Sequence, residues 1–158
     1  MFAANPDDEE FVNSAAMFNC KLALRYRQKG KEMAQISTIW ITDNKYEILA
    51  NRKFSSNIKY MCTILRGCET GKIKLLLKGS DTVVLDLLSE QEKINWSEKK
   101  LGEILGNEAA DGYRILIWAQ KELTEEEFTE WWNKHRKLIE TSVEGDNSPQ
   151  LKKAWQEV

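Results

Sequence analysis

The stretch KLLLKGSDTVV, residues 74–84, places a lysine and a glycine directly after a short apolar run. The run at 75–77 is typical of a buried strand, and the residues after Gly79 predict a helix at about 80–88. Lys78 and Gly79 then have two explanations. They form an ordinary turn from strand to helix, or the lysine binds a phosphate group.

The neighbouring segments predict further strands that are joined by hairpins. Residues 58–66 and 72–78 are expected to be two strands around the glycine-containing loop at 67–71. Residues 20–27 alternate between apolar and basic side chains, which is typical of a half-buried strand with a solvated basic face and less often of a binding patch. Three more strands are expected at 34–42, at 45–53 after a turn at Asp43-Asn44, and at 113–119.

Helix-start patterns flank these strands. Asn5-Pro6-Asp7-Asp8 opens a first helix, Thr124 with Glu127 forms a capping box, and Ser148-Pro149 begins a short last helix. A further helix is expected at about 92–109. The helix after Thr124 carries an apolar stripe that is expected to pack in the core: Phe128, Trp131, Trp132, Leu138 and Ile139. The sum predicts an α+β fold in which helices flank a twisted antiparallel sheet, as a single domain over residues 1–158.

Composition excludes several classes of function. The 158 residues carry a net charge of −2, which gives no electrostatic reason to bind nucleic acid or an anionic membrane surface. No apolar run is long enough to span a bilayer. Three cysteines without CxxC spacing and one histidine argue against a zinc site, a disulfide framework and His general-base chemistry, and favour reduced intracellular thiols. Cys62 and Cys68 are interpreted as small apolar fillers.

Four short segments, read in order, carry a resemblance to a known family. They are 6–8 (PDD), 54–62 (FSSNIKYMC), 78–81 (KGSD) and 112–116 (GYRIL), and 125–131 (EEEFTEW) adds a fifth match. In order and spacing they resemble the nucleotide-binding (N) domain of P-type ATPases of the phospholipid-transporting, or flippase, class. The resemblance covers nearly the whole chain and implies the N-domain fold.

The resemblance also implies an ATP site. Phe54 is the expected platform for adenine, since stacking a base on an aromatic ring contributes about 1–3 kcal/mol. Lysines at 59 and 78 are expected to bind phosphates as compact charges, and Arg114 to reach them from a neighbouring strand. Asp8 stands where the family has a glutamate that approaches the adenine amino group. Met61 and Gly79 complete the expected set.

Strand periodicity adds an expectation about geometry. If 58–66 is a regular strand, Lys59 and Met61 share one face of it, and Lys78 shares a face with Lys74 and Leu76. Gly79 is expected to leave room for the ligand to approach. Where the family has arginine, arginine and serine, this chain has Ile58, Tyr60 and Cys62, so the surface is less basic and nucleotide affinity is expected to be reduced or lost.

Each candidate also has an ordinary structural explanation. Phe54 is then a core aromatic, and Lys78 a charge where a strand reaches solvent. Arg114 is then a solvated residue on an edge strand, and Asp8 serves only the dipole of the first helix.

The resemblance further implies a larger parent protein. The phosphorylated Asp-Lys-Thr-Gly-Thr motif, the hinge motifs and the membrane helices of the family are absent from this sequence, so the chain is expected to be a fragment of a multi-pass membrane ATPase at the cytosolic face of a membrane. The expected cofactor is ATP with Mg²⁺, the metal being held mainly by the phosphorylation domain. The phosphorylation and actuator domains of the same chain are the expected partners. The alternatives are a degenerate flippase-like module that senses nucleotide or acts as a scaffold, for example fused to a guanylyl cyclase, and a plain interaction domain that uses the tryptophan-rich helix.

Overall fold

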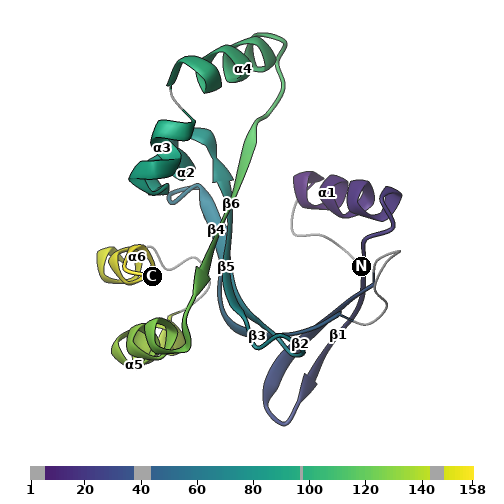
Figure 1. Ribbon diagram of the computed structural model, residues 1–158, viewed down its shortest axis with the longest axis vertical. Coiled ribbons are helices and arrows are strands. Elements are labelled where there is room, and N and C mark those ends of the chain that lie inside the picture. The colour runs from purple at the N-terminus through teal and green to yellow at the C-terminus, as the bar shows by residue number, and fades with distance from the viewer. Residues whose placement is uncertain (1–5, 38–43, 97, 143–147) are drawn as a thin grey trace. The chain divides into compact units, whose positions relative to one another are not determined.

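The computed structural model describes residues 6–37, 44–96, 98–142 and 148–158, and these form two compact units. The first unit comprises the described residues up to Ala50 together with Leu65–Lys72, and the second comprises Asn51–Ile64 and the described residues from Ile73 onward. Strands hydrogen-bond in the order β1-β2-β3-β4-β5-β6 in an antiparallel sheet, so the α+β prediction is confirmed (Figure 1). A single domain over 1–158 stays a prediction.

The elements follow the chain in a simple order. The strands are β1 (Lys21–Gln28), β2 (Lys31–Ser37), β3 (Asn44–Arg52), β4 (Tyr60–Gly67), β5 (Ile73–Ser80) and β6 (Leu116–Leu123). The helices are α1 (Pro6–Met17), α2 (Asp81–Leu87), α3 (Glu90–Asn95), α4 (Glu98–Ala110), α5 (Glu125–Thr141) and α6 (Pro149–Gln156). In the described part of the chain, no helix has the length and apolar character that crossing a bilayer requires.

The first unit differs from the sequence expectations in two places. Strand β2 begins at Lys31, after a turn in which Lys29 and Gly30 have φ angles of 50° and 80°. Within β1 the register shifts between Leu22 and Leu24, and both side chains are exposed, so the prediction of a half-buried face is wrong there. The register shift breaks the period-two alternation on which that prediction depended. Residues 38–43, which hold the second half of the strand expected at 34–42 and the first residue of the expected Asp43-Asn44 turn, lie outside the described residues.

The second unit contains the best-packed part of the sheet. Strand β5 pairs with β6 over eight residue pairs, from Ile73 opposite Leu123 to Ser80 opposite Leu116. Tyr60, Cys62 and Ile64 alternate as buried residues along β4. Cys62 behaves as the expected apolar filler, because burial raises the pKa of its thiol to about 12 and keeps it protonated. Cys68 is exposed, so the same prediction is wrong for that residue.

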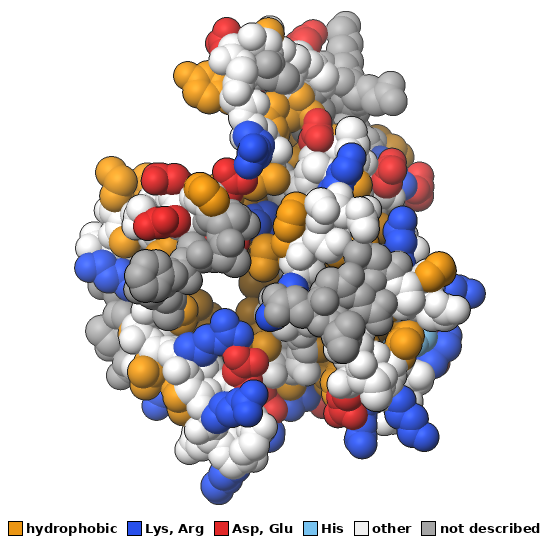
Figure 2. Space-filling model, turned by 180° about the vertical axis from the view of Figure 1, so that it is seen from behind, with side chains coloured by type: hydrophobic (Ala, Val, Ile, Leu, Met, Phe, Trp, Pro, Cys, Tyr) orange, Lys and Arg blue, Asp and Glu red, His pale blue; other side chains and the backbone are white. Residues whose placement is uncertain are grey.

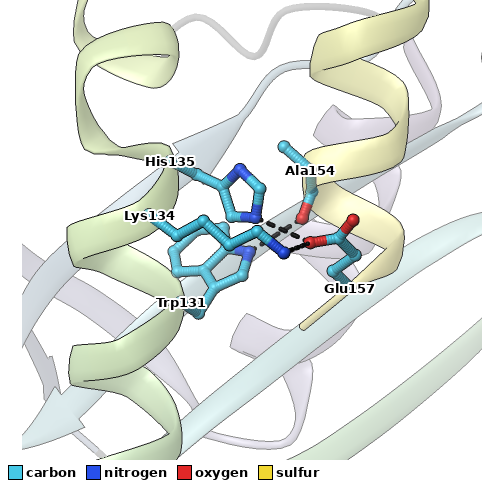
Figure 3. A network of polar contacts seen from close by, with 5 residues as sticks. All are labelled: Trp131, Lys134, His135, Ala154 and Glu157. Atoms are coloured by element: carbon cyan, nitrogen blue, oxygen red, sulfur yellow. Dashed lines mark hydrogen bonds and ion pairs between the residues drawn. The ribbon is translucent and has the colours of Figure 1, made fainter.

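Helices α5 and α6 confirm the capping predictions and part of the stripe prediction, because Phe128 and Trp131 are buried whereas the other three stripe residues are only half-buried. The Thr124 hydroxyl accepts a hydrogen bond from the backbone N–H of Glu127, whose carboxylate accepts one from the Thr124 N–H in return. Trp131 is buried, and its indole N–H donates to the Ala154 carbonyl at 2.7 Å (Figure 3). Its ring meets the Trp155 ring edge-on, with 5.1 Å between the ring centroids. The interaction-domain alternative loses support, because this tryptophan of the α5 stripe packs against α6.

Two further elements have different bounds from those that the sequence predicts. The helix expected at 92–109 is two helices: α3 begins after Ser89, whose side chain accepts from the Glu92 N–H, and ends at Asn95, because Trp96 leaves the helical conformation with a φ of −103° and a ψ of 48°. The strand expected at 113–119 starts at Leu116, since Gly112 has a φ of 82° and the Tyr113 N–H donates to the Glu108 carbonyl, which ends α4. Residues up to 115 therefore belong to the turn that leaves α4.

Candidate functional site

A single tight turn before β4 presents two of the predicted site residues. The Ser55 carbonyl accepts hydrogen bonds from the N–H groups of Ile58 at 3.1 Å and Lys59 at 2.8 Å. Ile58 is buried and anchors the turn, whereas Phe54 is 50% exposed and Lys59 is exposed. An aromatic side chain so open to solvent does not fill a core, so the structural explanation of Phe54 as a core residue is wrong.

Lys59 has an uncommon backbone conformation. Its φ is 58°, in the left-handed region that non-glycine residues rarely adopt and that costs of order 1 kcal/mol. Its carbonyl accepts a hydrogen bond of 3.0 Å from the Ser80 N–H at the end of β5. Because Lys59 precedes the strand, the expectation that it alternates with Met61 along β4 is wrong.

Gly79 has a different role from the one expected. A Cβ at this position would lie 2.6 Å from the Tyr60 Cβ, 2.7 Å from the Lys59 carbonyl oxygen and 2.9 Å from the Tyr60 Cα. The space beside Gly79 is therefore occupied by the chain at Lys59–Tyr60, and the expectation that it stays open for a ligand is wrong. Gly79 and Ser80 instead hold the turn that carries Phe54 and Lys59 against the end of β5.

Lys78 lies on the opposite face of the sheet from Gly79. It pairs in register with Trp118 of β6, and its Nζ lies 5.4 Å from the centroid of the Trp118 ring. Trp118 is 58% exposed, so an aromatic surface stands open beside the lysine. Since Tyr60 points to the Gly79 face, alternation puts Met61 on the same face as Lys78.

Trp118 is the residue that sequence reasoning missed. It lay inside an apolar run that predicted only a buried strand, and nothing local distinguishes its exposed face. The signal that finds it is the pairing of β5 with β6, which is a long-range feature.

Arg114 reaches the same end of the sheet from a third segment. It is exposed in the turn before β6, so its expected place on a strand is wrong. Leu116, two residues later, pairs with Ser80, and the Ser80 N–H binds the Lys59 carbonyl. The start of β4, the end of β5 and the start of β6 thus meet, and with them the segments of Phe54, Lys59, Lys78 and Arg114.

The predicted residue Asp8 belongs to a different compact unit from the other candidates. Asp8 lies on α1 in the first compact unit, and its part in a site with Phe54 stays a prediction. Among residues 6–37, 44–96, 98–142 and 148–158, no group of three or more His, Cys, Asp and Glu side chains is placed to hold a metal ion. Basic and acidic side chains are interspersed over the face drawn in Figure 2.

Known proteins that are similar to this chain are P-type ATPases. A family model described as P-type ATPase, cytoplasmic domain N, matches residues 21–148. Phospholipid-transporting ATPase tat-1 of Caenorhabditis elegans is 31% identical over 137 residues, which is 87% of this chain and 12% of that protein. Phospholipid-transporting ATPase IC of Homo sapiens is 32% identical over 157 residues, or 99% of this chain and 12% of that protein. The chain thus spans about a tenth of the length of these relatives.

Proposed function

Because the chain belongs to the family of P-type ATPase cytoplasmic N domains, we propose that it binds ATP where β4 begins and β5 ends. In this proposal it presents the γ-phosphate to an aspartate on a separate phosphorylation domain of the same parent chain. The parent is then a phospholipid-translocating ATPase, with this domain at the cytosolic face of its membrane.

The observation that carries the proposal is the contact between two motif segments. Gly79 packs against Tyr60, and Ser80 donates to the Lys59 carbonyl, so the strand end and the turn are fixed to each other. This contact holds the exposed Phe54 ring and the exposed Lys59 side chain near the strand that carries Lys78. A flat base and a chain of phosphates need such an arrangement of one aromatic face and separated cations.

Each residue has a defined part in the proposed site. Phe54 stacks on adenine, and Lys59, Lys78 and Arg114 stabilise the phosphate charges from three segments of chain. Met61 provides apolar contact on the face it shares with Lys78.

Transfer of the γ-phosphoryl group would depend on the positioning of ATP and on stabilisation of the phosphate charges, because the proposed nucleophile is an aspartate outside this chain. Mg²⁺ neutralises phosphate charge when it is bound, and we propose that its ligands come mainly from the phosphorylation domain. The actuator domain of the same parent is a further proposed partner. ATP is released in every cycle, so an affinity on the order of 1 mM, or about −4 kcal/mol, is expected.

The alternative of a nucleotide-sensing or scaffolding module without transport is not favoured. The relatives named above are described as phospholipid-transporting ATPases, and the Lys59, Lys78 and Gly79 positions of the motifs are present here.

An ATP titration followed by amide NMR tests the proposal. Shifts are expected for the backbone at 54–61, 78–80 and 114–116. Phe54→Ala is expected to weaken ATP binding by about 1–3 kcal/mol, because the adenine loses its stacking partner. Lys78→Ala is expected to weaken ATP binding by about 1.5–3 kcal/mol, because a charged hydrogen bond to a phosphate is lost. The matched control is Lys137→Ala, an exposed lysine on α5, which follows the opposite end of β6.

Two results would contradict the proposal in different ways. If ATP at several millimolar shifts none of these amides, this chain does not bind nucleotide. If binding survives undiminished in both Phe54→Ala and Lys78→Ala, or falls equally in Lys137→Ala, ATP binds at another place or through unspecific attraction.

A further inference from the structure

Strand β1 is an edge strand that is open to a partner. Among the described strands it has one neighbour, β2, with which it forms a hairpin in the first compact unit (Figure 1). An edge strand presents a row of backbone N–H and C=O groups that its own sheet does not bind. Every residue of β1 except Tyr26 is exposed. The outer edge of β1 and the side chains on both of its faces are therefore accessible.

The same hairpin is strongly basic. Residues 21–31 (KLALRYRQKGK) contain five lysines and arginines and no carboxylate. Two of these cations are paired, because Arg25 Nε donates to Glu32 Oε1 at 2.7 Å, and Lys31 Nζ lies 2.9 Å from Glu47 Oε1. The other three are exposed and form no ion pair with any described residue: Lys21, Arg27 and Lys29. The chain as a whole carries a net charge of −2, so this positive charge is local and favours an acidic partner.

Strand register separates the cations from the apolar side chains. Beyond the register shift, β1 pairs regularly with β2 over residues 24–28. Arg25 and Arg27 therefore lie on one face of the strand, and Leu24 and Tyr26 on the other. Charges on an edge strand also protect a sheet from association with itself. That explanation does not cover the apolar face, where Leu24 is 52% exposed.

We propose that β1 binds an extended segment of a partner polypeptide in which acidic and apolar residues alternate. The segment adds a strand beyond β1. Because side chains directly opposite each other in a sheet share a face, its acidic residues pair with Arg25 and Arg27 while its apolar residues cover Leu24 and Tyr26. None of the residues proposed to contact ATP takes part.

The open backbone and the charges together select this partner. A lipid surface or a nucleic acid would use the cations but not the alternating donors and acceptors of the strand edge. A second copy of β1 is disfavoured as well. Two such strands paired antiparallel about Tyr26 would set Arg25 opposite Arg27, and like charges directly opposite each other destabilise a sheet.

Titration of the full chain with the acetylated and amidated peptide Ser-Glu-Val-Glu-Val-Glu-Val-Ser, followed by amide NMR, tests the proposal. Saturable shifts are expected at residues 24–28, with slower hydrogen exchange of the β1 amides that point away from β2. Arg27→Gln is expected to weaken peptide binding about threefold, because one cross-strand charge pair is lost, and to leave ATP binding unchanged. The matched control is Arg136→Gln, an exposed arginine on α5, which is expected to bind the peptide as the unmodified chain does.

Further peptides separate strand addition from general charge attraction. Ser-Glu-Glu-Glu-Val-Val-Val-Ser has the same composition without the alternation, and it is expected to bind about tenfold more weakly. Methylation of the valine amide nitrogens blocks one edge of the probe peptide, and methylation of the glutamate amide nitrogens blocks the other edge. One of these two methylated peptides is expected to lose binding and the other to retain it, since only one edge faces β1.

Several results would overturn the proposal. The first is that the probe peptide at about 1 mM shifts none of residues 24–28. The second is that the peptide without alternation, or both methylated peptides, bind as tightly as the probe. The third is that Arg136→Gln weakens binding as much as Arg27→Gln. If phosphatidylserine vesicles shift these amides and the probe does not, the partner is a lipid surface and the proposal is wrong.

Discussion

Replacement of Gly79 by alanine tests how the two motif segments are held together. The added methyl group would meet the Lys59 carbonyl oxygen at 2.7 Å and the Tyr60 Cα at 2.9 Å, which are backbone atoms that no rotamer change relieves. Its 2.6 Å contact with the Tyr60 Cβ is equally fixed, because that atom is bonded to the backbone. The chain at Lys59 must therefore move away from β5, and the Ser80–Lys59 hydrogen bond lengthens or breaks.

The expected cost follows from two opposing terms. Overpacking of this kind costs about 1–3 kcal/mol, and a glycine in a strand is itself about 0.5–1 kcal/mol less favourable than alanine. We expect Gly79→Ala to lower the free energy of unfolding by about 1–2 kcal/mol, or a fall in Tm of roughly 2–8 °C for a chain of this length. ATP affinity is expected to fall as well, since Lys59 and Phe54 move with the turn.

The assay is urea unfolding followed by tryptophan fluorescence, with NMR of the Lys59 and Ser80 amides. Gly106→Ala is the matched control, because a Cβ there meets nothing within 4 Å and α4 is expected to gain about 0.8–1 kcal/mol from it. If Gly79→Ala unfolds as the unmodified chain does and loses only ATP affinity, the space beside Gly79 belongs to the ligand and our reasoning is refuted.

Three further predictions concern single contacts. Trp118→Leu removes the ring next to Lys78 and is expected to cost about 0.5–1 kcal/mol of stability; a shift of the Lys78 Nζ resonance measures the lost contact, and an unchanged resonance contradicts it. Thr124→Ala removes half of the capping box and is expected to cost about 1 kcal/mol in thermal unfolding, whereas Thr124→Ser is expected to retain most of it. Hydrogen bonds from Lys134 and then His135 hold the pKa of Glu157 below its usual 4.5. A carboxyl group whose pKa is lower in the folded state stabilises the fold fully only above its unfolded pKa. The unmodified chain is therefore expected to be more stable than Glu157→Ala above pH 4.5, and this difference is lost as the pH falls through the folded pKa of Glu157. A difference that persists in acid would argue against the contacts of Glu157 with Lys134 and His135.

Local features of the fold were predictable from the sequence. The capping box at Thr124 and the hairpin loop at 67–71 depend on residues a few positions apart, so their sequence patterns were sufficient. Strand and helix ends were predicted less well. The turn that leaves α4 at Gly112 delays β6 and moves Arg114 off the strand, because capping bonds compete with strand pairing for the same backbone groups.

In the candidate site, too, the sequence predicts some features and only the tertiary structure shows the others. The sequence alone determined which residue types stand in the motif segments, including Phe54, Lys59 and Lys78, because those are short patterns in fixed order. Only the tertiary structure decided what Gly79 contacts, and that Trp118 faces Lys78. It also decided that the Tyr60 hydroxyl is buried without a partner among the described residues. These are contacts between segments far apart in the chain, and they are fixed by strand register and packing, which no local pattern encodes.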